Sequence, residues 1–186
     1  RCYDDRVPEE VNRRIIDHSS DILLPYTGRS RLNLLAEGIP GERIFVTGNP
    51  IYEVINHFRR EIEASSSLEN LGVSAGDYFL VTMHREENVD VPERLSRLLE
   101  ALSLISEEYG KDIIVSTHPR TRRRLTDRGE GVPAGKVRFL DPFGFFDFIQ
   151  LEKNALCVLS DSGTVQEECA ILEKPCVILR DATERP

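Results

Sequence analysis

The sequence lacks several features that would point to nucleic-acid or membrane binding. No long stretch of Lys and Arg interleaves with aromatic residues, and the net charge of −8 opposes a phosphodiester backbone. No apolar run approaches the roughly 20 residues of a membrane-spanning helix, and the first residues do not have the composition of a signal peptide. We therefore predict no nucleic-acid partner, no membrane partner and a cytoplasmic location.

Cysteine is sparse, and its spacing does not favour a metal site. There is no C-x-x-C pair, and three of the four cysteines lie in apolar stretches. The histidines are scattered instead of repeating at the short spacings of metal-ligand sets. We expect buried, reduced thiols and no bound metal. The cysteines are Cys2, Cys157, Cys169 and Cys176, and the histidines are His18, His57, His84 and His118.

The chain has enough apolar content for a real core. Hydrophobic residues make up 40% of its 186 residues, which suits one domain or one and a fraction. The sequence opens without Met in a polar segment, and no further element follows its last apolar run. We expect it to be a piece of a longer protein.

Short β-rich runs alternate with segments of helical period, which is the pattern of a parallel sheet with crossover helices. Most of the runs are apolar in their centres, as strands covered on both faces should be. The fold class is therefore predicted to be α/β with a parallel sheet. The predicted strands are residues 21–25, 43–47, 78–83, 112–117, 136–140, 155–160 and 175–180.

Capping and breaking residues predict the helices between these strands. Thr27 can cap a helix over 28–37, and Pro92 suits the first turn of a helix that runs to about Tyr109 before Gly110. Further helices are predicted over 9–17 and over 51–62. The stretch 63–76, EASSSLENLGVSAG, is rich in small residues and is interpreted as a surface connection at a domain boundary.

Polar side chains follow several predicted strands, and ligands of open parallel sheets bind beyond the carboxyl ends of the strands. His84 begins the loop HREEN after one strand, and His118 begins the segment HPR after the next. An imidazole there can contact phosphate or move a proton. The alternative for HREEN is a solvated charged loop, and the basic run 120–124 fits a solvated helix start better than a phosphate clamp.

Aromatic residues cluster at 142–148, PFGFFDF, after a further strand. Aromatics at helical spacing usually belong to the core, and that is the interpretation for Phe143, Phe145 and Phe146. One aromatic of this cluster could instead stack on a base.

The turn at 160–168, SDSGTVQEE, is the strongest candidate for an anion site. Gly163 permits close backbone approach, Ser162 and Thr164 supply hydroxyls, and a helix starting near Thr164 would point unpaired N–H groups at a ligand. Two readings of Glu167 and Glu168 stay open. They could complement the helix dipole from the first turn, or one of them could accept hydrogen bonds from a ribose diol.

Two patches near the ends of the chain could add to a site. PEEVNR, at 8–13, places paired carboxylates at the start of a helix, where they could move protons at carbon or only complement the helix dipole. RDATERP, at 180–186, provides Arg185 for a diphosphate.

Taken in order, PEEVNR, IFVTGNP, HREEN, HP, SDSGTVQEE and RDATERP resemble the non-hydrolysing UDP-N-acetylglucosamine 2-epimerase family. The resemblance implies a glycosyltransferase-B-like fold of two Rossmann-like domains. Residues 1–48 would end the N-terminal domain, 49–76 would be a connecting helix and linker, and 77–186 would be most of the UDP-binding domain. It also implies a homodimer and epimerisation at carbon 2 without a redox cofactor, through elimination of UDP to a glycal and its re-addition.

The same resemblance carries roles over to single residues. Glu9 and His84 would be catalytic, Glu168 would hold the ribose, and Phe148 would lie by the uracil. Other UDP or substrate contacts fall on His118, Ser162, Gly163, Thr164 and Arg185.

Three departures from the family pattern limit the expectation. The chain has DSGT where DSGG is usual and HREEN where HRRE is common, so the exact UDP-hexosamine is open. The family's HGD and VEAG segments, each with a catalytic carboxylate, are absent from the chain. We therefore expect the isolated fragment to be inactive. The alternatives are a UDP-sugar-dependent glycosyltransferase of the same fold and a non-catalytic UDP-binding module.

Overall fold

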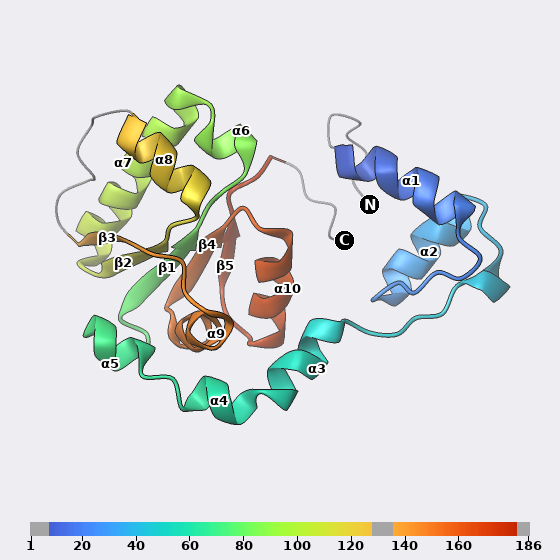
Figure 1. Cartoon of the computed structure of the whole chain (residues 1–186), viewed down its shortest axis with the longest axis horizontal. Coiled ribbons are helices and arrows are strands. Elements are labelled where there is room, and N and C mark those ends of the chain that lie inside the picture. Colours follow the sequence, from blue (N-terminus) through green and yellow to red (C-terminus); the bar gives the residue numbers. More distant parts are fainter. Residues whose placement is uncertain (1–7, 128–135, 182–186) are drawn as a thin grey trace. The chain divides into compact units, whose positions relative to one another are not determined.

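The computed structural model of the chain describes residues 8–127 and 136–181 (Figure 1). The chain forms two compact units, which divide between Asn56 and His57 and again between Arg180 and Asp181. In the described ranges, no helix is long and apolar enough to cross a membrane.

The first unit contains helices α1 (Pro8–Ser19) and α2 (Gly28–Ala36), the 3-10 turn η1 (Gly41–Arg43) and most of α3 (Pro50–His57). Thr27 caps α2 as predicted, because its hydroxyl accepts a hydrogen bond from the Ser30 amide at 3.1 Å. A small core fills the space between these elements. It consists of Leu23, Leu34, Ile39 and Ile44.

The two strands predicted for this unit, 21–25 and 43–47, are reduced to one parallel bridge between Leu23 and Ile44. The segments still pair through their backbones, since the Leu23 amide donates to the Arg43 carbonyl at 2.8 Å and the Phe45 amide to the Leu23 carbonyl at 2.9 Å. The turn η1 takes the beginning of the second segment out of the extended conformation, which shortens the ladder.

The described residues of the second unit form a five-stranded, fully parallel sheet in the order β3-β2-β1-β4-β5 (Figure 1). All five strands predicted for this region are confirmed, each within three residues of its expected bounds. The strands are β1 (Tyr78–Thr82), β2 (Asp112–Ser116), β3 (Val137–Leu140), β4 (Cys157–Ser160) and β5 (Cys176–Ile178).

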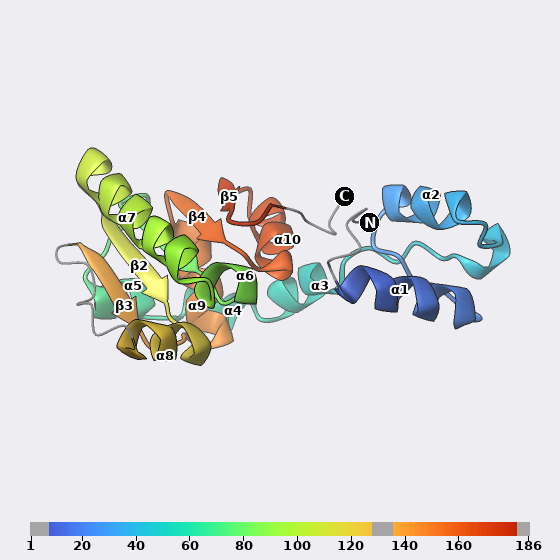
Figure 2. The same ribbon diagram turned by 90° about the horizontal axis from the view of Figure 1, so that it is seen from above.

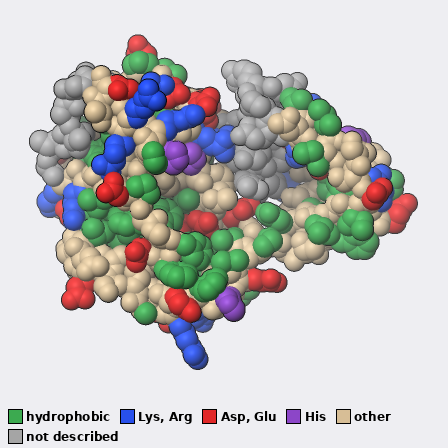
Figure 3. Space-filling view, in the orientation of Figure 1, with side chains coloured by type: hydrophobic (Ala, Val, Ile, Leu, Met, Phe, Trp, Pro, Cys, Tyr) green, Lys and Arg blue, Asp and Glu red, His purple; other side chains and the backbone are tan. Residues whose placement is uncertain are grey.

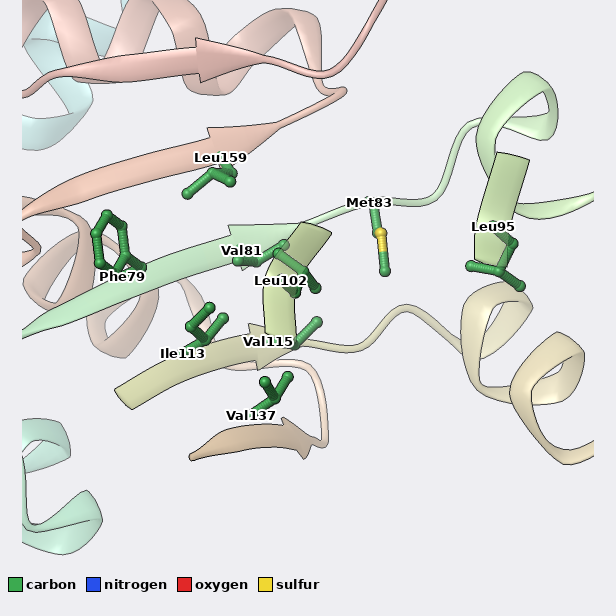
Figure 4. Packing of buried hydrophobic residues seen from close by; sticks show 9 residues of the cluster. All are labelled: Phe79, Val81, Met83, Leu95, Leu102, Ile113, Val115, Val137 and Leu159. Atoms are coloured by element: carbon green, nitrogen blue, oxygen red, sulfur yellow. The ribbon is translucent and has the colours of Figure 1, made fainter. Parts of the chain in front are cut away.

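Two apolar layers hold helices against this sheet because successive strand residues point to opposite faces. Phe79 and Val81 of β1 face one layer, which includes Leu95 and Leu102 of α7 (Pro92–Tyr109) (Figure 4). Leu125 of α8 (Pro119–Asp127) packs against the same layer.

Tyr78 and Leu80 point to the other face of the sheet. They pack there with residues of α9 (Phe145–Asn154) and α10 (Gly163–Ile171), and with Leu68 and Leu71 of α5 (Ser67–Leu71). Figure 2 shows α7 running along the sheet in a second view. The long central helix has the bounds that the sequence predicted, and Gly110 ends it at φ +64°.

The region between the two predicted strand groups is more helical than expected. The single helix predicted over 51–62 is two helices, α3 and α4 (Arg59–Glu63), because the backbone of Phe58 leaves the helical conformation at φ −96°, ψ 20°. The predicted surface connection 63–76 contains α5, which Gly72 ends at φ +66°. Part of this segment of small residues is therefore helical and not an irregular loop.

Candidate functional site

The strand order reverses between β1 and β4, so the loops that follow these two strands leave the sheet side by side. This switch point is where open α/β sheets bind their ligands. HREEN continues from β1 into α6 (Glu86–Val89), and SDSGT continues from β4 into α10. The sequence predicted that both loops lie at carboxyl ends of strands, and the strand order makes them neighbours.

One buried carboxylate joins these two loops. Asp161, fully buried, accepts hydrogen bonds from the backbone N–H groups of His84 at 3.0 Å and of Arg85 at 3.0 Å. The Asn88 side-chain amide donates to the same carboxylate at 2.9 Å and to the Leu179 carbonyl at 2.8 Å, just after β5. The loops after β1, β4 and β5 are therefore connected through one hydrogen-bond network.

His84 and His118 come together as predicted from their positions after neighbouring strands. Their ring centroids are 5.4 Å apart with an interplanar angle of 38°. The Arg120 amide donates to Nδ1 of His118 at 3.2 Å, which leaves Nε2 of this exposed ring for another partner. Burial lowers the pKa of His84 below its usual value; Asp161 opposes the lowering, and His118, Arg85 and Arg120 add to it.

The turn into α10 has the geometry of an anion site. Ser162 is the N-cap residue in extended conformation, yet its hydroxyl makes no capping bond and lies 3.1 Å from the Thr164 hydroxyl. Gly163 is buried at the first helical position. The first N–H groups of any α-helix lack partners within the helix, so they and the two hydroxyls can serve an anion together.

Glu168 lies too far along α10 for the helix-dipole interpretation. The helix begins at Gly163, and the first turn contains no acidic residue. Glu168 is 8% exposed, and burial first, then the neighbouring Glu167, raise its pKa to about 7. None of the described residues donates a hydrogen bond to its carboxylate, so a ligand hydroxyl is a chemically fitting partner.

The aromatic cluster after β3 divides into two groups. Phe143 and Phe148 pack against the core under α9 and α10, in agreement with the core interpretation of Phe143. For Phe145 and Phe146 that interpretation is wrong, since they are 39% and 38% exposed. They are the first two residues of α9, before the buried Ile149 and Leu151, and Phe146 contacts Phe58 at 5.3 Å between ring centroids.

The basic run at the start of α8 is an ion-paired surface, as its interpretation as a solvated helix start implies. Arg120 lies 2.8 Å from Glu86, and Arg124 lies 2.9 Å from Asp90. Figure 3 shows these signs interleaved, with basic and acidic side chains side by side over the α6 and α8 end of the visible face. Glu86, which replaces an Arg of the related motif, thus has a partner of its own.

The two patches at the ends of the chain are only partly described. Glu9 lies in the first turn of α1, and Arg185 is outside the described residues. The neighbouring Glu10 is buried and pairs with Arg13 at 3.0 Å and with Arg14 at 3.3 Å. Glu10 is therefore part of an ion-pair network within the first unit.

The cysteines and acidic residues give no metal site in the part of the chain that the structure describes. Cys157, Cys169 and Cys176 are free thiols, and Cys169 is buried, where its sulfur donates to the Glu152 carboxylate at 3.0 Å. Burial raises the pKa of Glu152 to about 8. Cys2 lies outside the described residues.

The sequence reasoning missed Asp161 and Asn88, although both lie in motifs that it singled out. A charged residue directly after a buried strand was the available signal for Asp161. The signal for Asn88 is weaker, because a polar residue in a charged loop is ordinary. Both become visible only when the two loops are neighbours.

The sheet order and the turn into α10 define an α/β protein of the Rossmann-like class. The family model described as UDP-N-acetylglucosamine 2-epimerase matches residues 1–186. The chain therefore belongs to the UDP-N-acetylglucosamine 2-epimerase family.

Known relatives and structures agree with this assignment. The chain is 43% identical over 192 residues to a UDP-N-acetylglucosamine 2-epimerase of Methanocaldococcus jannaschii, covering 100% of the chain and 52% of the relative. It is 35% identical over 187 residues to a UDP-2,3-diacetamido-2,3-dideoxy-D-glucuronate 2-epimerase of Pseudomonas aeruginosa, covering 99% of the chain and 50% of the relative. The chain thus spans about half the length of the curated relatives it matches.

A solved structure of the Methanocaldococcus jannaschii enzyme, in complex with UDP-GlcNAc and UDP, matches with a TM-score of 0.90 and 43% identity. The match covers 100% of this chain and 52% of that one. Such likenesses confirm the predicted fold class, glycosyltransferase-B-like with a Rossmann-like parallel sheet.

Proposed function

We propose that the chain is the UDP-binding half of a UDP-N-acetylglucosamine 2-epimerase or of an epimerase for a related UDP-N-acetyl-hexosamine. The observation that carries the proposal is the convergence of the His84 loop and the Ser162–Thr164 turn at the switch point of the sheet, with the buried Glu168 carboxylate on α10. Relatives named for this activity, 43% identical over the full chain, support it.

In this proposal the chain has the domain roles that the resemblance implies. Residues 1–48 end an N-terminal domain, 49–76 connect, and 77–186 bind UDP. The helix N-terminus at Gly163 and the hydroxyls of Ser162 and Thr164 serve the diphosphate, together with His118 and Arg185. Glu168 accepts hydrogen bonds from the ribose, and Phe148 lies on the uracil side.

The chemistry follows from the charges that develop. A proton leaves carbon 2 while the diphosphate departs, which requires a proton acceptor and stabilisation of the leaving group. Glu9 and His84 are the proposed catalytic groups, and a lowered pKa keeps His84 neutral and able to accept a proton. No redox cofactor is needed. The cytoplasmic location and the homodimer stay predictions.

The test is to incubate the whole protein with UDP-N-acetylglucosamine and follow the products by proton NMR. We expect UDP-N-acetylmannosamine, with free UDP and the glycal at low levels. The variant His84→Gln should lower kcat by about 10²–10⁴-fold, the range typical for loss of a general acid or base. His57→Gln, at an exposed histidine away from the switch point, should leave kcat unchanged.

The two alternatives predict different products. A glycosyltransferase of the same fold would release UDP only when a sugar acceptor is present and would form no glycal. A non-catalytic module would bind UDP in calorimetry without converting the sugar. Either result with the whole protein would contradict the epimerase proposal.

A further inference from the structure

Asp161 is a buried carboxylate whose partners come mainly from another loop. Its two oxygens accept hydrogen bonds from the backbone N–H groups of His84 and Arg85. One of the two oxygens, Oδ2, also accepts a hydrogen bond from the side-chain amide of Asn88. The residue itself is 0% exposed. A carboxylate in such a position needs several donors to offset the cost of its burial, and the loop after β1 supplies them.

The imidazole of His84 faces the same carboxylate. Its Nδ1 atom lies 3.3 Å from Oδ1 of Asp161. An ionised carboxylate can only accept hydrogen bonds, so the nitrogen that faces it has to carry the hydrogen. In a neutral ring the other nitrogen, Nε2, then has a lone pair.

We propose that Asp161 is the positioning residue of His84, which holds its ring in the Nδ1–H tautomer with Nε2 as the proton-accepting atom. This inference rests on the proposed function, in which His84 exchanges a proton with the UDP-sugar. The hydrogen bonds that the backbone N–H groups of His84 and Arg85 donate to Asp161 fix the loop, and the contact between Nδ1 of His84 and the carboxylate orients the ring.

An asparagine at 161 would separate these two tasks. Its amide oxygen could still accept the backbone N–H groups, so the loop would keep its main support. Its amide nitrogen is a donor, and next to Nδ1 it would favour a lone pair on that atom. The ring would then carry its hydrogen on Nε2 and could no longer accept a proton there.

The direct test is nitrogen-15 NMR of labelled histidine in the whole protein at pH 8, with the His84 signals assigned by their loss in His84→Gln. We expect an Nδ1–H ring in the wild type and an Nε2–H or mixed ring in Asp161→Asn. The variant should lower kcat by about 10- to 10⁴-fold, the range typical when the partner that orients a functional histidine is removed. KM and the Kd for UDP should change by no more than roughly threefold, because only the proton transfer is affected.

The pH profile adds a second readout. The charged or titratable groups that face His84 are Asp161, His118, Arg85 and Arg120. Of these groups, only Asp161 raises the pKa of His84, so removing its charge should lower that pKa further. The acidic limb of the kcat profile should therefore move to lower pH in Asp161→Asn. Asp77→Asn is the matched control, since Asp77 pairs with Lys111 before β1 and has the same charge to lose. It should leave the His84 tautomer unchanged.

The outcomes separate this inference from the proposed function. An Nε2–H ring in the wild type overturns the positioning role, even if Asp161→Asn fails to fold. An unchanged tautomer and kcat in a folded Asp161→Asn overturns it as well. Absence of epimerisation by the wild type would instead count against the proposed function, and the tautomer would still decide the role of Asp161.

Discussion

The hydroxyl of Thr121, in α8, donates a hydrogen bond of 2.6 Å to the backbone carbonyl of Met83, just after β1. Both residues are buried. The bond connects the start of α8 to the end of β1. His118, directly before α8, and His84, directly after Met83, are therefore close neighbours. This is how His118 and His84 come within 5.4 Å of each other.

Replacing Thr121 by Val should destabilise the protein because it leaves the buried Met83 carbonyl without this donor. The expected loss in the free energy of unfolding is about 1–3 kcal/mol, measured by urea denaturation. Thr126→Val is the control on the same helix, where the exposed hydroxyl bonds the Arg122 carbonyl and the loss should stay below about 0.5 kcal/mol. Equal losses in the two variants would contradict a special role for the Thr121 bond.

If Glu168 holds the ribose of UDP, as proposed, its raised pKa makes UDP binding depend on pH. The ionised carboxylate accepts hydrogen bonds from ribose hydroxyls on both oxygens, whereas the protonated acid turns one oxygen into a donor. With a pKa of about 7, Glu168 loses its charge as the pH falls from 8 to 6. If only the ionised form binds, affinity for UDP should fall by about tenfold over this range, as measured by calorimetry.

The control for this pH dependence is Glu168→Gln. The terminal phosphate of UDP also takes up a proton near pH 6, and that contribution persists in the variant. The variant should bind more weakly than the wild type at pH 8 and show a shallower pH dependence. An identical slope in both proteins would show that Glu168 does not contact the nucleotide.

Gly110 closes the long helix α7 at φ +64°, a conformation that a Cβ atom disfavours. Gly110→Ala should lower the free energy of unfolding by about 1 kcal/mol, although nothing lies within 4 Å of the added methyl group. Gly144→Ser also adds a Cβ atom without close neighbours, but at φ −65° and at the N-cap of α9, a position that favours Ser, so it should not lower the free energy of unfolding. Similar losses at both sites would exclude backbone strain as the cause.

Glu173 has φ 55°, in the region where side chains are strained, at the turn between α10 and β5. Glu173→Gly should raise the free energy of unfolding by about 0.5–1 kcal/mol, the relief of strain less the added entropy of the unfolded chain. The same substitution at the exposed Glu100, inside α7, should lower it by about 1 kcal/mol. A loss of stability in Glu173→Gly would refute the strain argument.

The sequence predicted the second unit well because its signals are local. The apolar runs around Leu80, Ile114 and Val158 and the capping residues around α7 define their elements without help from distant residues. The order of the strands is different, since each run is equally apolar and nothing local says that β4 adds beside β1. The core interpretation of Phe145 and Phe146 was wrong for a related reason, because spacing alone does not tell whether the first residues of a helix are covered by other elements.

The candidate site was predictable as a set of strand ends but not as a set of partners. His84 and His118 could be paired because consecutive crossovers repeat the same position. The pairing of Asp161 with Asn88 could not be predicted, because it depends on a contact between loops 73 residues apart in the chain. Glu168 gained its interpretation from burial and from the true start of α10, which the sequence placed one residue too late.

The carboxylate of Asp161 has a consequence for protein engineering. A loop transplanted from a relative onto the end of β1 would bring its own backbone donors but would have to meet an acceptor that belongs to the turn after β4. The two loops therefore have to be exchanged as a matched pair, with the short stretch around Leu179 that Asn88 also contacts. Exchanging the two loops and this stretch together should therefore change substrate preference more readily than replacing single residues.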